Sequence, residues 1–232
     1  MTDLIGIKDA VVTSDDCWMP RGKPIKQLTG WDVAPTVEAR LDRDPGFINR
    51  LSQQTLTDWW LAVSPRANTP NWDIASTCLV GGEPGLLLVE AKAHANELSA
   101  SGKSKPTTRN GRKNHGRIAT AICEANAAFE GVTGMPWSLS RDHCYQLSNR
   151  FAWAWKLVSL GIPVILIYLG FLAAEEMADD GPLFYTHDDW INSLKHHSAG
   201  TVNDSCWENP LYFDRVPLLP LIRTLEQPFG TD

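Results

Sequence analysis

The chain has 232 residues, of which 43% are hydrophobic and 21% are charged, and its formal net charge is −6. This length suits one sizeable hydrophobic core, and the composition is that of a folded chain rather than a disordered one. The negative net charge argues against a generic polyanion binder, so any contact with nucleic acid has to come from a local basic patch.

The cysteine pattern and the apolar segments bear on the cellular environment. Five cysteines, an odd number without a CxxC pair, argue against a disulfide framework and against a zinc finger. The N-terminus lacks the basic start and apolar run of a signal peptide. The most apolar segment, 161–174, is shorter than the ~20 residues that span a membrane. We therefore expect a cytoplasmic protein with reduced thiols and no contact with a membrane.

The first half of the chain predicts helices followed by a β-hairpin. Residues 34–43 have a short helical pattern. In 44–63 apolar residues recur close to every 3.6 positions, which predicts an amphipathic helix beginning after Asp44 and Pro45. The segments WDIASTCLV and GLLLVEAKA predict two strands joined by the turn GGEP, residues 81–84.

The second half predicts helices, a buried strand and a proline-broken end. In chain order we expect a loop over 99–117, helices over 116–134 and 142–161, a strand over 164–172, a helix capped by Thr186, and over 216–226 an edge strand or packed extension. This order predicts an α/β fold in which helices flank a central mixed β-sheet. We expect a single domain over 1–232, with 1–43 as an N-terminal extension and 175–232 as a C-terminal extension packed on the core.

Three charged residues at the predicted hairpin suggest a metal site. Glu90 and Lys92 lie two positions apart at a strand end and so point to the same face. A four-residue turn would pair Val80 with Gly85, place Asp73 opposite Lys92, and leave Glu90 diagonal to Asp73. A slip of one residue would move Asp73 to the other face. Two carboxylates on one face can share Mg²⁺, and a nearby lysine can act on an attacking water.

The pattern NWD, hairpin, VEAK resembles the D…(D/E)xK signature of the PD-(D/E)XK nuclease superfamily, over the region from residue 44 to about 172. The resemblance implies a restriction-endonuclease-like core and metal-dependent hydrolysis of nucleic-acid phosphodiesters, with DNA favoured as the substrate. It also implies that Asp73 and Glu90 bind Mg²⁺ or Mn²⁺ and that Lys92 is the catalytic base or electrostatic partner. Nucleases of this kind often act as homodimers or beside a partner protein.

The chain departs from the family pattern before and after these residues. Pro70 is separated from Asp73 by two residues, whereas the family proline directly precedes its aspartate. The family often adds an acidic residue, for which Glu38 and Asp58 both remain open. Some members add a glutamine on the following helix, and Gln146 occupies a similar place. Asn149 and Arg150 share the polar part of that helix and are further candidates for binding substrate.

A basic segment follows the hairpin. No acidic residue lies between Glu97 and Glu124, and the basic residues there are Lys103, Lys105, Arg109, Arg112, Lys113 and Arg117. Such a segment can neutralise backbone phosphates, and the other interpretation is a solvated loop. His94 and Glu97 follow Lys92 closely enough to reach the same site. His196 and His197 are adjacent on a predicted helix and so are not expected to share a face.

Other interpretations of the motif remain open. One is a catalytically inactive module that keeps the fold and binds nucleic acid or protein. The others are an unrelated α/β enzyme in which the motif is accidental, and a surface charge pair, which contributes little to stability.

Overall fold

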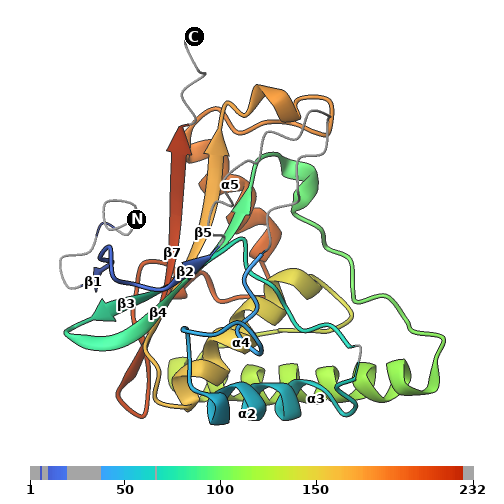
Figure 1. Ribbon diagram of the computed structural model, residues 1–232. Helices are drawn as coiled ribbons and strands as arrows, with labels where there is room; N and C mark the ends of the chain where they lie inside the picture. The colour runs from blue at the N-terminus through green and yellow to red at the C-terminus, as the bar shows by residue number, and fades with distance from the viewer. Residues whose placement is uncertain (1–5, 7–9, 20–37, 66, 227–232) are drawn as a thin grey trace, which may run out of the picture.

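The computed structural model describes residues 6, 10–19, 38–65 and 67–226. It is an α/β fold with a curled, mixed sheet of seven strands in the order β1-β3-β4-β5-β7-β6, in which β2 also pairs with β3. Figure 1 shows β4, β5 and β7 standing side by side above α2, α3 and α4. The expectation of an α/β fold with a central mixed sheet flanked by helices is confirmed.

The bounds of the strands are β1 Ala10–Val11, β2 Trp18–Met19, β3 Ile74–Val80, β4 Glu83–Lys92, β5 Val164–Leu172, β6 Leu211–Phe213 and β7 Val216–Glu226. Those of the helices are α2 Arg50–Trp60, α3 Arg109–Thr133, α4 Tyr145–Ser159 and α5 His187–Ser198, with short 3₁₀ turns η1 Ala95–Glu97, η2 Glu175–Met177 and η3 Asp204–Cys206. Within the described ranges, no helix is both long and apolar enough to cross a lipid bilayer.

Two predictions near the start of the described region are wrong. Helix α2 begins at Arg50 rather than after Pro45, because the Asn49 side chain accepts a hydrogen bond from the backbone of Ser52 at 2.9 Å and caps the helix there. Of the short helix expected over 34–43, positions 34–37 lie outside the described residues. The remainder contains an isolated bridge between Ala39 and Trp72 followed by a turn.

The basic segment is helical from Arg109 onward, which corrects the expected loop over 99–117. Thr108 caps helix α3 by accepting a hydrogen bond from the backbone of Gly111 at 3.1 Å. Arginine and lysine are good helix formers, so a polar, glycine-containing sequence does not by itself exclude a helix. Arg109, Arg112 and Lys113 therefore project from a regular element.

Strand β7 is an interior strand over part of its length, not an edge strand or extension. It pairs in parallel with β5 along all nine β5 residues and antiparallel with β6 at its start. Pro217 lies at the start of the strand, where it pairs with Tyr212 of β6, and Pro220 lies beyond the end of β6. From residue 219 on, the side of β7 away from β5 carries no further strand among the elements described, and a proline is tolerated on such an edge.

The hairpin turn is tighter than predicted. Gly81 and Gly82 alone form it, with φ of 60° and 85°, so Val80 pairs with Glu83 instead of Gly85. Two consecutive positive φ values are typical of a type I′ turn, whose twist matches that of the strands. The pairing is shifted by two positions from the expected one. A shift of two keeps every side chain on its expected face.

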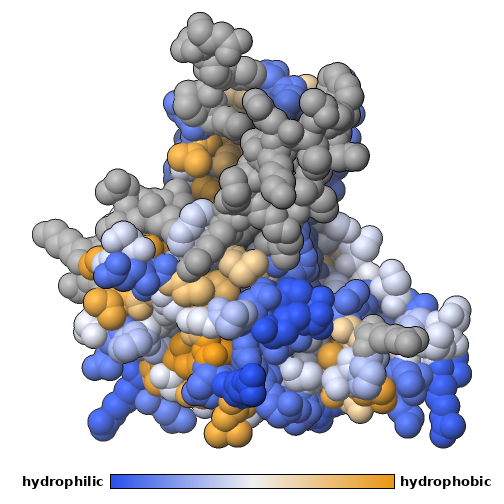
Figure 2. Space-filling model, in the orientation of Figure 1, coloured by the Kyte–Doolittle hydropathy of each residue, from blue (hydrophilic) through white to orange (hydrophobic). Residues whose placement is uncertain are grey.

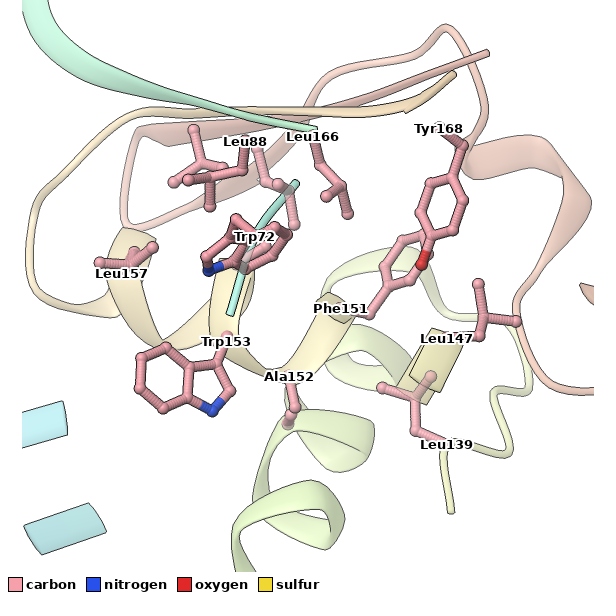
Figure 3. Close-up of a cluster of buried hydrophobic side chains, with 14 of the residues drawn as sticks. Trp72, Leu88, Leu139, Leu147, Phe151, Ala152, Trp153, Leu157, Leu166 and Tyr168 are labelled. Carbon is pink, nitrogen blue, oxygen red and sulfur yellow. The ribbon is translucent and has the colours of Figure 1, made fainter. Parts of the chain in front are cut away.

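The helices all contribute to one face of the sheet. Leu86 and Leu88 belong to a core that includes residues from α2, α3, α4 and α5, whereas Leu87 and Val89 point into a second, smaller core. Figure 3 shows the larger core, with Trp72 lying between the strands and the α4 residues Phe151 and Trp153. Because Glu90 and Lys92 continue the even-numbered series of β4, their side chains point toward the helices.

Candidate active site

Asp73, Glu90 and Lys92 meet at the open end of the β3–β4 hairpin. The β3–β4 ladder ends with the pair of Ile74 and Val89, so the same register continued by one residue sets Asp73 opposite Glu90. The Asp73 carboxylate accepts a hydrogen bond from the backbone N–H of Ala91 at 2.7 Å. Asp73 thus directly faces Glu90 and not Lys92, which corrects the expected pairing. The tighter turn brings the two carboxylates closer than the diagonal arrangement would.

Glu90 is the centre of what we call the Glu90 ion cluster, which comprises Glu90, Lys92, Gln146 and Arg150. The carboxylate is 1% exposed. Its Oε1 accepts hydrogen bonds from Lys92 Nζ and from Gln146 Nε2, the latter at 2.6 Å. Its Oε2 accepts one from Arg150 Nε. A carboxylate this deeply buried requires such partners, and here two of the three are cations.

The two carboxylates differ in their electrostatics. Burial, together with the negative charge of Glu90, raises the pKa of Asp73 to about 6. Burial alone would raise the pKa of Glu90 as well, but the charges and hydrogen bonds of Arg150 and Lys92 outweigh it and hold that pKa below its usual value. Glu90 is therefore ionised at neutral pH, and Asp73 changes protonation only slightly below it.

Trp72 fixes the backbone that carries Asp73. Its N–H and C=O exchange hydrogen bonds with Ala39 at 2.8 and 2.9 Å, and its side chain is fully buried. The guanidinium of Arg150 lies 4.8 Å from the centroid of the Trp72 ring, within cation–π range. Arg150 thus contacts both strands of the hairpin from helix α4.

The two candidates for a third acidic residue are in different places. Glu38 precedes Ala39, so the Ala39–Trp72 bridge sets its backbone at the pairing position next to Asp73. Asp58 lies on the exposed side of α2 and accepts a hydrogen bond from Gln54 at 2.8 Å. In the described part of the chain, no three His, Cys, Asp or Glu residues are arranged to hold a metal ion. The carboxylates that face each other here are those of Asp73 and Glu90, and two carboxylates with water are a common ligand set for Mg²⁺.

The other predicted residues near the hairpin have structural contacts. Gln146 is brought to Glu90, while Arg150, which the sequence suggested only as a substrate contact, is buried against the same carboxylate. The two are four positions apart on α4 and so share a face, a signal that sequence reasoning can use. Glu97 accepts hydrogen bonds from the backbone of Ala93 and His94, which stabilises the end of β4.

The basic residues lie beside this site rather than within it. Lys103 is held near the start of α4, where its Nζ lies 4.8 Å from the Tyr145 ring centroid and its backbone N–H donates to the Arg141 carbonyl at 2.8 Å. The others are exposed: Lys105, Arg109, Arg112 and Lys113. Figure 1 shows this segment passing down one side of the molecule to α3, and Figure 2 shows hydrophilic residues at the corresponding lower right.

Comparison with models of protein families, with curated proteins and with solved structures finds no match to this chain. The function is therefore argued from the arrangement of the residues themselves.

Proposed function

We propose that this protein is a metal-dependent phosphodiesterase of the PD-(D/E)XK type, with a restriction-endonuclease-like core, that hydrolyses nucleic acid, with DNA as the favoured substrate. The observation that carries the proposal is the meeting of Asp73, Glu90 and Lys92 at the end of one hairpin. Gln146 reaches Glu90 from α4, the second long helix after the hairpin, whereas the resemblance implies a glutamine on the following helix.

The electrostatics support a cation at this place. Two carboxylates face each other in a largely buried setting, and the negative charge of Glu90 contributes to the raised pKa of Asp73. Asp73 and Glu90 would hold Mg²⁺ or Mn²⁺, with Glu38 as the acidic residue nearest in the backbone pairing. When bound, such a cation supplies a nucleophile at neutral pH and neutralises charge developing on phosphorus.

Lys92 is the residue of this chain that is placed to act on the water. Its Nζ donates to Glu90 and to the Ala91 carbonyl, the latter at 3.0 Å, so it is oriented along the end of β4. A lysine there can orient the attacking water or offset negative charge in the transition state. Arg150 and Gln146 position Glu90.

A second candidate function is supported by the same ion cluster. Both oxygens of Glu90 already accept hydrogen bonds, two of them from cations. A module that keeps the fold and binds nucleic acid or protein without cleaving it would use the cluster only for stability. The two candidates predict different results in one experiment.

The test is incubation of the purified protein with single- and double-stranded DNA and RNA, in Mg²⁺, in Mn²⁺ and in chelator. We expect cleavage that requires the metal and that falls by at least a hundredfold in Lys92→Ala, because this variant lacks the group that acts on the attacking water. Lys156→Ala on the same protein is the matched control and should cleave at the normal rate.

Two results would contradict catalysis at this site. Cleavage that persists unchanged in Lys92→Ala would move the chemistry elsewhere. Binding of nucleic acid without cleavage in either metal would favour the inactive module. Circular dichroism and thermal melting of each variant establish that a loss of activity is not a loss of fold.

A further inference from the structure

A hollow lined by histidines lies beside the Glu90 ion cluster. It has a volume of about 440 Å³ and is bounded by η1 and the segment after it, by the start of α4 and by the end of α5. His143, His196 and His197 line it together with Ser193, and none of its lining residues is acidic. We call it the histidine hollow. It gathers half of the chain's six histidines in a protein whose net charge is −6.

Its walls are joined by hydrogen bonds. The backbone N–H groups of Cys144 and Tyr145 donate to the carbonyls of Ala100 and Ser101 at 3.0 and 3.1 Å. The thiol of Cys144 lies 3.8 Å from the carbonyl oxygen of His197, which it contacts as a donor. The start of α4 is therefore hydrogen-bonded both to the segment after η1 and to the end of α5. His196 and His197, which as neighbours on a helix are not expected to share a face, both line the hollow at the end of α5.

The backbone at the wall formed by α4 is constrained. Cys144 is the N-cap residue of α4, has a φ of 42° and is 1% exposed. A left-handed conformation is uncommon for a residue other than glycine, and it persists only where the surroundings enforce it. Its side chain makes no capping hydrogen bond to the first turn. The positive end of the α4 dipole is thus at the hollow.

The hollow presents hydrogen-bonding groups rather than fixed charges. Burial lowers the pKa of His197, and the nearby His143, Lys92 and His196 lower it further, so this imidazole is neutral at pH 7 and can donate one hydrogen bond. Two acidic residues lie close in sequence to the walls. Glu97 accepts hydrogen bonds from the backbone of Ala93 and His94, and Asp142 is paired with Arg141 through hydrogen bonds of 2.9 and 2.7 Å. Neither of them lines the hollow, so its walls are left with groups that can donate to an anion.

The groups around the hollow are donors that suit an anion. Among the described residues, the side chains that line it do not form a group of three metal ligands. Imidazole and hydroxyl groups and a helix N-terminus together suit a phosphate, whose oxygens accept hydrogen bonds. The backbone tether from Lys103 to Arg141 places the basic segment next to the same wall.

We propose that the histidine hollow binds a backbone phosphate of the nucleic-acid strand whose scissile bond lies at the site of Asp73, Glu90 and Lys92. This inference rests on the proposed function, since it assumes that a polynucleotide occupies that site. The strand then continues from the hollow along Lys103 and Lys105 to the first turns of α3. By holding this phosphate, the hollow determines which phosphodiester bond of the strand lies at Asp73, Glu90 and Lys92.

The experiment measures binding without catalysis. In chelator, a single-stranded DNA oligonucleotide and inorganic phosphate are titrated separately into the protein, and the imidazole signals are followed by nuclear magnetic resonance. We expect both probes to shift the signals of His143, His196 and His197. The signal of His187, which contacts Thr224 at the other end of α5, should stay in place.

The matched variants are His143→Ala with His196→Ala, and His187→Ala as the control. His143, His196 and His187 are all exposed, so the substitutions should leave the melting temperature unchanged. We expect the double variant to bind the oligonucleotide about tenfold more weakly, from the loss of two hydrogen-bonding groups at a phosphate. The control should bind normally.

The outcomes separate this inference from the proposed function. Equal oligonucleotide affinity in the double variant, or shifts with inorganic phosphate alone, would overturn the assignment of a strand phosphate to the hollow. Histidine shifts and weakened binding in a protein that cleaves nothing would remove the catalytic proposal and support the phosphate site. Metal-dependent cleavage together with normal oligonucleotide binding in the double variant would support the catalytic proposal and remove the phosphate site.

Discussion

At the scale of single residues, Asp73 and Glu90 show how two carboxylates on one hairpin acquire different properties. Glu90 is surrounded by Lys92, Gln146 and Arg150, whereas Asp73 receives one backbone hydrogen bond. The first is stabilised in its charged form, and the second is penalised by burial and by its neighbour's charge. The pKa values differ because two side chains of α4, Gln146 and Arg150, donate hydrogen bonds to Glu90.

The Asp73 carboxyl makes stability depend on pH. Its pKa rises from 3.8 to about 6 on folding, so the native state binds more protons than the unfolded state between those values. The free energy of unfolding should therefore fall by about 3 kcal/mol from this group as the pH rises from 4 to 6, and it should stay level above that. Asp73→Asn should remove that dependence and raise the free energy of unfolding at pH 7.5, measured by urea titration.

The control for this prediction is Asp58→Asn, which changes an exposed carboxyl on α2. It should leave the pH dependence as it is. An Asp73→Asn protein that is less stable than the wild type at pH 7.5 would show that the charge of Asp73 is favourable in the folded protein. Addition of Mg²⁺ to the wild type should act in the same direction as the substitution, because a cation favours the ionised carboxyl.

Arg150 should be important for stability. Removing its charge leaves Glu90 buried with Lys92 as its remaining cation, and breaking a buried pair from one side costs about 3–5 kcal/mol. Arg150→Met should lower the free energy of unfolding by an amount in that range, measured by chemical denaturation. Adding Glu90→Gln should restore much of the loss, because the uncompensated charge is then gone.

The comparison for Arg150 is Lys156→Met in the last turn of α4, which should cost less than about 1 kcal/mol. If both substitutions on α4 cost the same, the ion cluster contributes nothing beyond ordinary helix packing. A double variant no more stable than Arg150→Met alone would also contradict the pairing.

The shared face of Asp73, Glu90 and Lys92 can be predicted from the sequence. The contact of Arg150 with Glu90 cannot, because it depends on tertiary packing. Alternation along β4 places Glu90 and Lys92 on one face whatever the register, and a shift of two positions leaves Asp73 on that face as well. The burial of Arg150 against Glu90 depends instead on where α4 packs on the sheet, and a local sequence pattern does not predict that position. From the sequence alone, a charged residue in a helix is predicted to be exposed, because its buried partner is not known.

At the scale of elements, regular runs were predictable and their ends were not. The apolar run of β5 and the cap of α5 at Thr186 lie where the sequence places them. The start of α2 was missed because Asn49 competes with Pro45 as a start signal, and the start of α3 because its first turns lack apolar residues. The role of β7 depends on its neighbours in the sheet, which local propensity does not report.

The contact between α5 and the sheet depends on a glycine. A Cβ at Gly170 of β5 would lie 2.6 Å from the Trp190 ring, and Trp190 is fully buried. Gly170→Ala should therefore push α5 from the sheet and lower the free energy of unfolding by about 1–3 kcal/mol. Thermal or urea denaturation measures the change.

The matched substitution is Gly131→Ala in α3, where a Cβ would meet nothing within 4 Å. Alanine is the better helix former, so this variant should gain up to about 1 kcal/mol. The same chemical change thus has opposite signs at the two positions. A Gly170→Ala protein as stable as the wild type would mean that α5 can shift without loss of packing.

At the scale of the whole molecule, the charge is uneven. The chain is acidic overall, yet a run of basic residues without an intervening acid follows the candidate site. Binding to DNA through this segment should therefore weaken steeply as salt rises from 50 to 200 mM, at a slope of roughly 0.9 per phosphate contact on a logarithmic scale. Fluorescence anisotropy in chelator measures the slope.

Replacing Arg109, Arg112 and Lys113 by glutamine should make that slope shallower by about two to three. Replacing Arg43 and Arg50, which are exposed near the start of α2, should leave it unchanged. An identical slope in both variants would show that the basic segment does not contact phosphates.

The ion cluster also has a consequence for the order in which the chain assembles. Glu90 lies in a hairpin that can form locally, whereas Arg150 is 60 positions further along. Because an unpaired buried carboxylate is costly, the hairpin's inner face cannot become dry before helix α4 arrives. Docking of α4 and pairing of β4 with β5 should therefore occur together in the folding transition state, and Arg150→Met should slow folding more than it speeds unfolding.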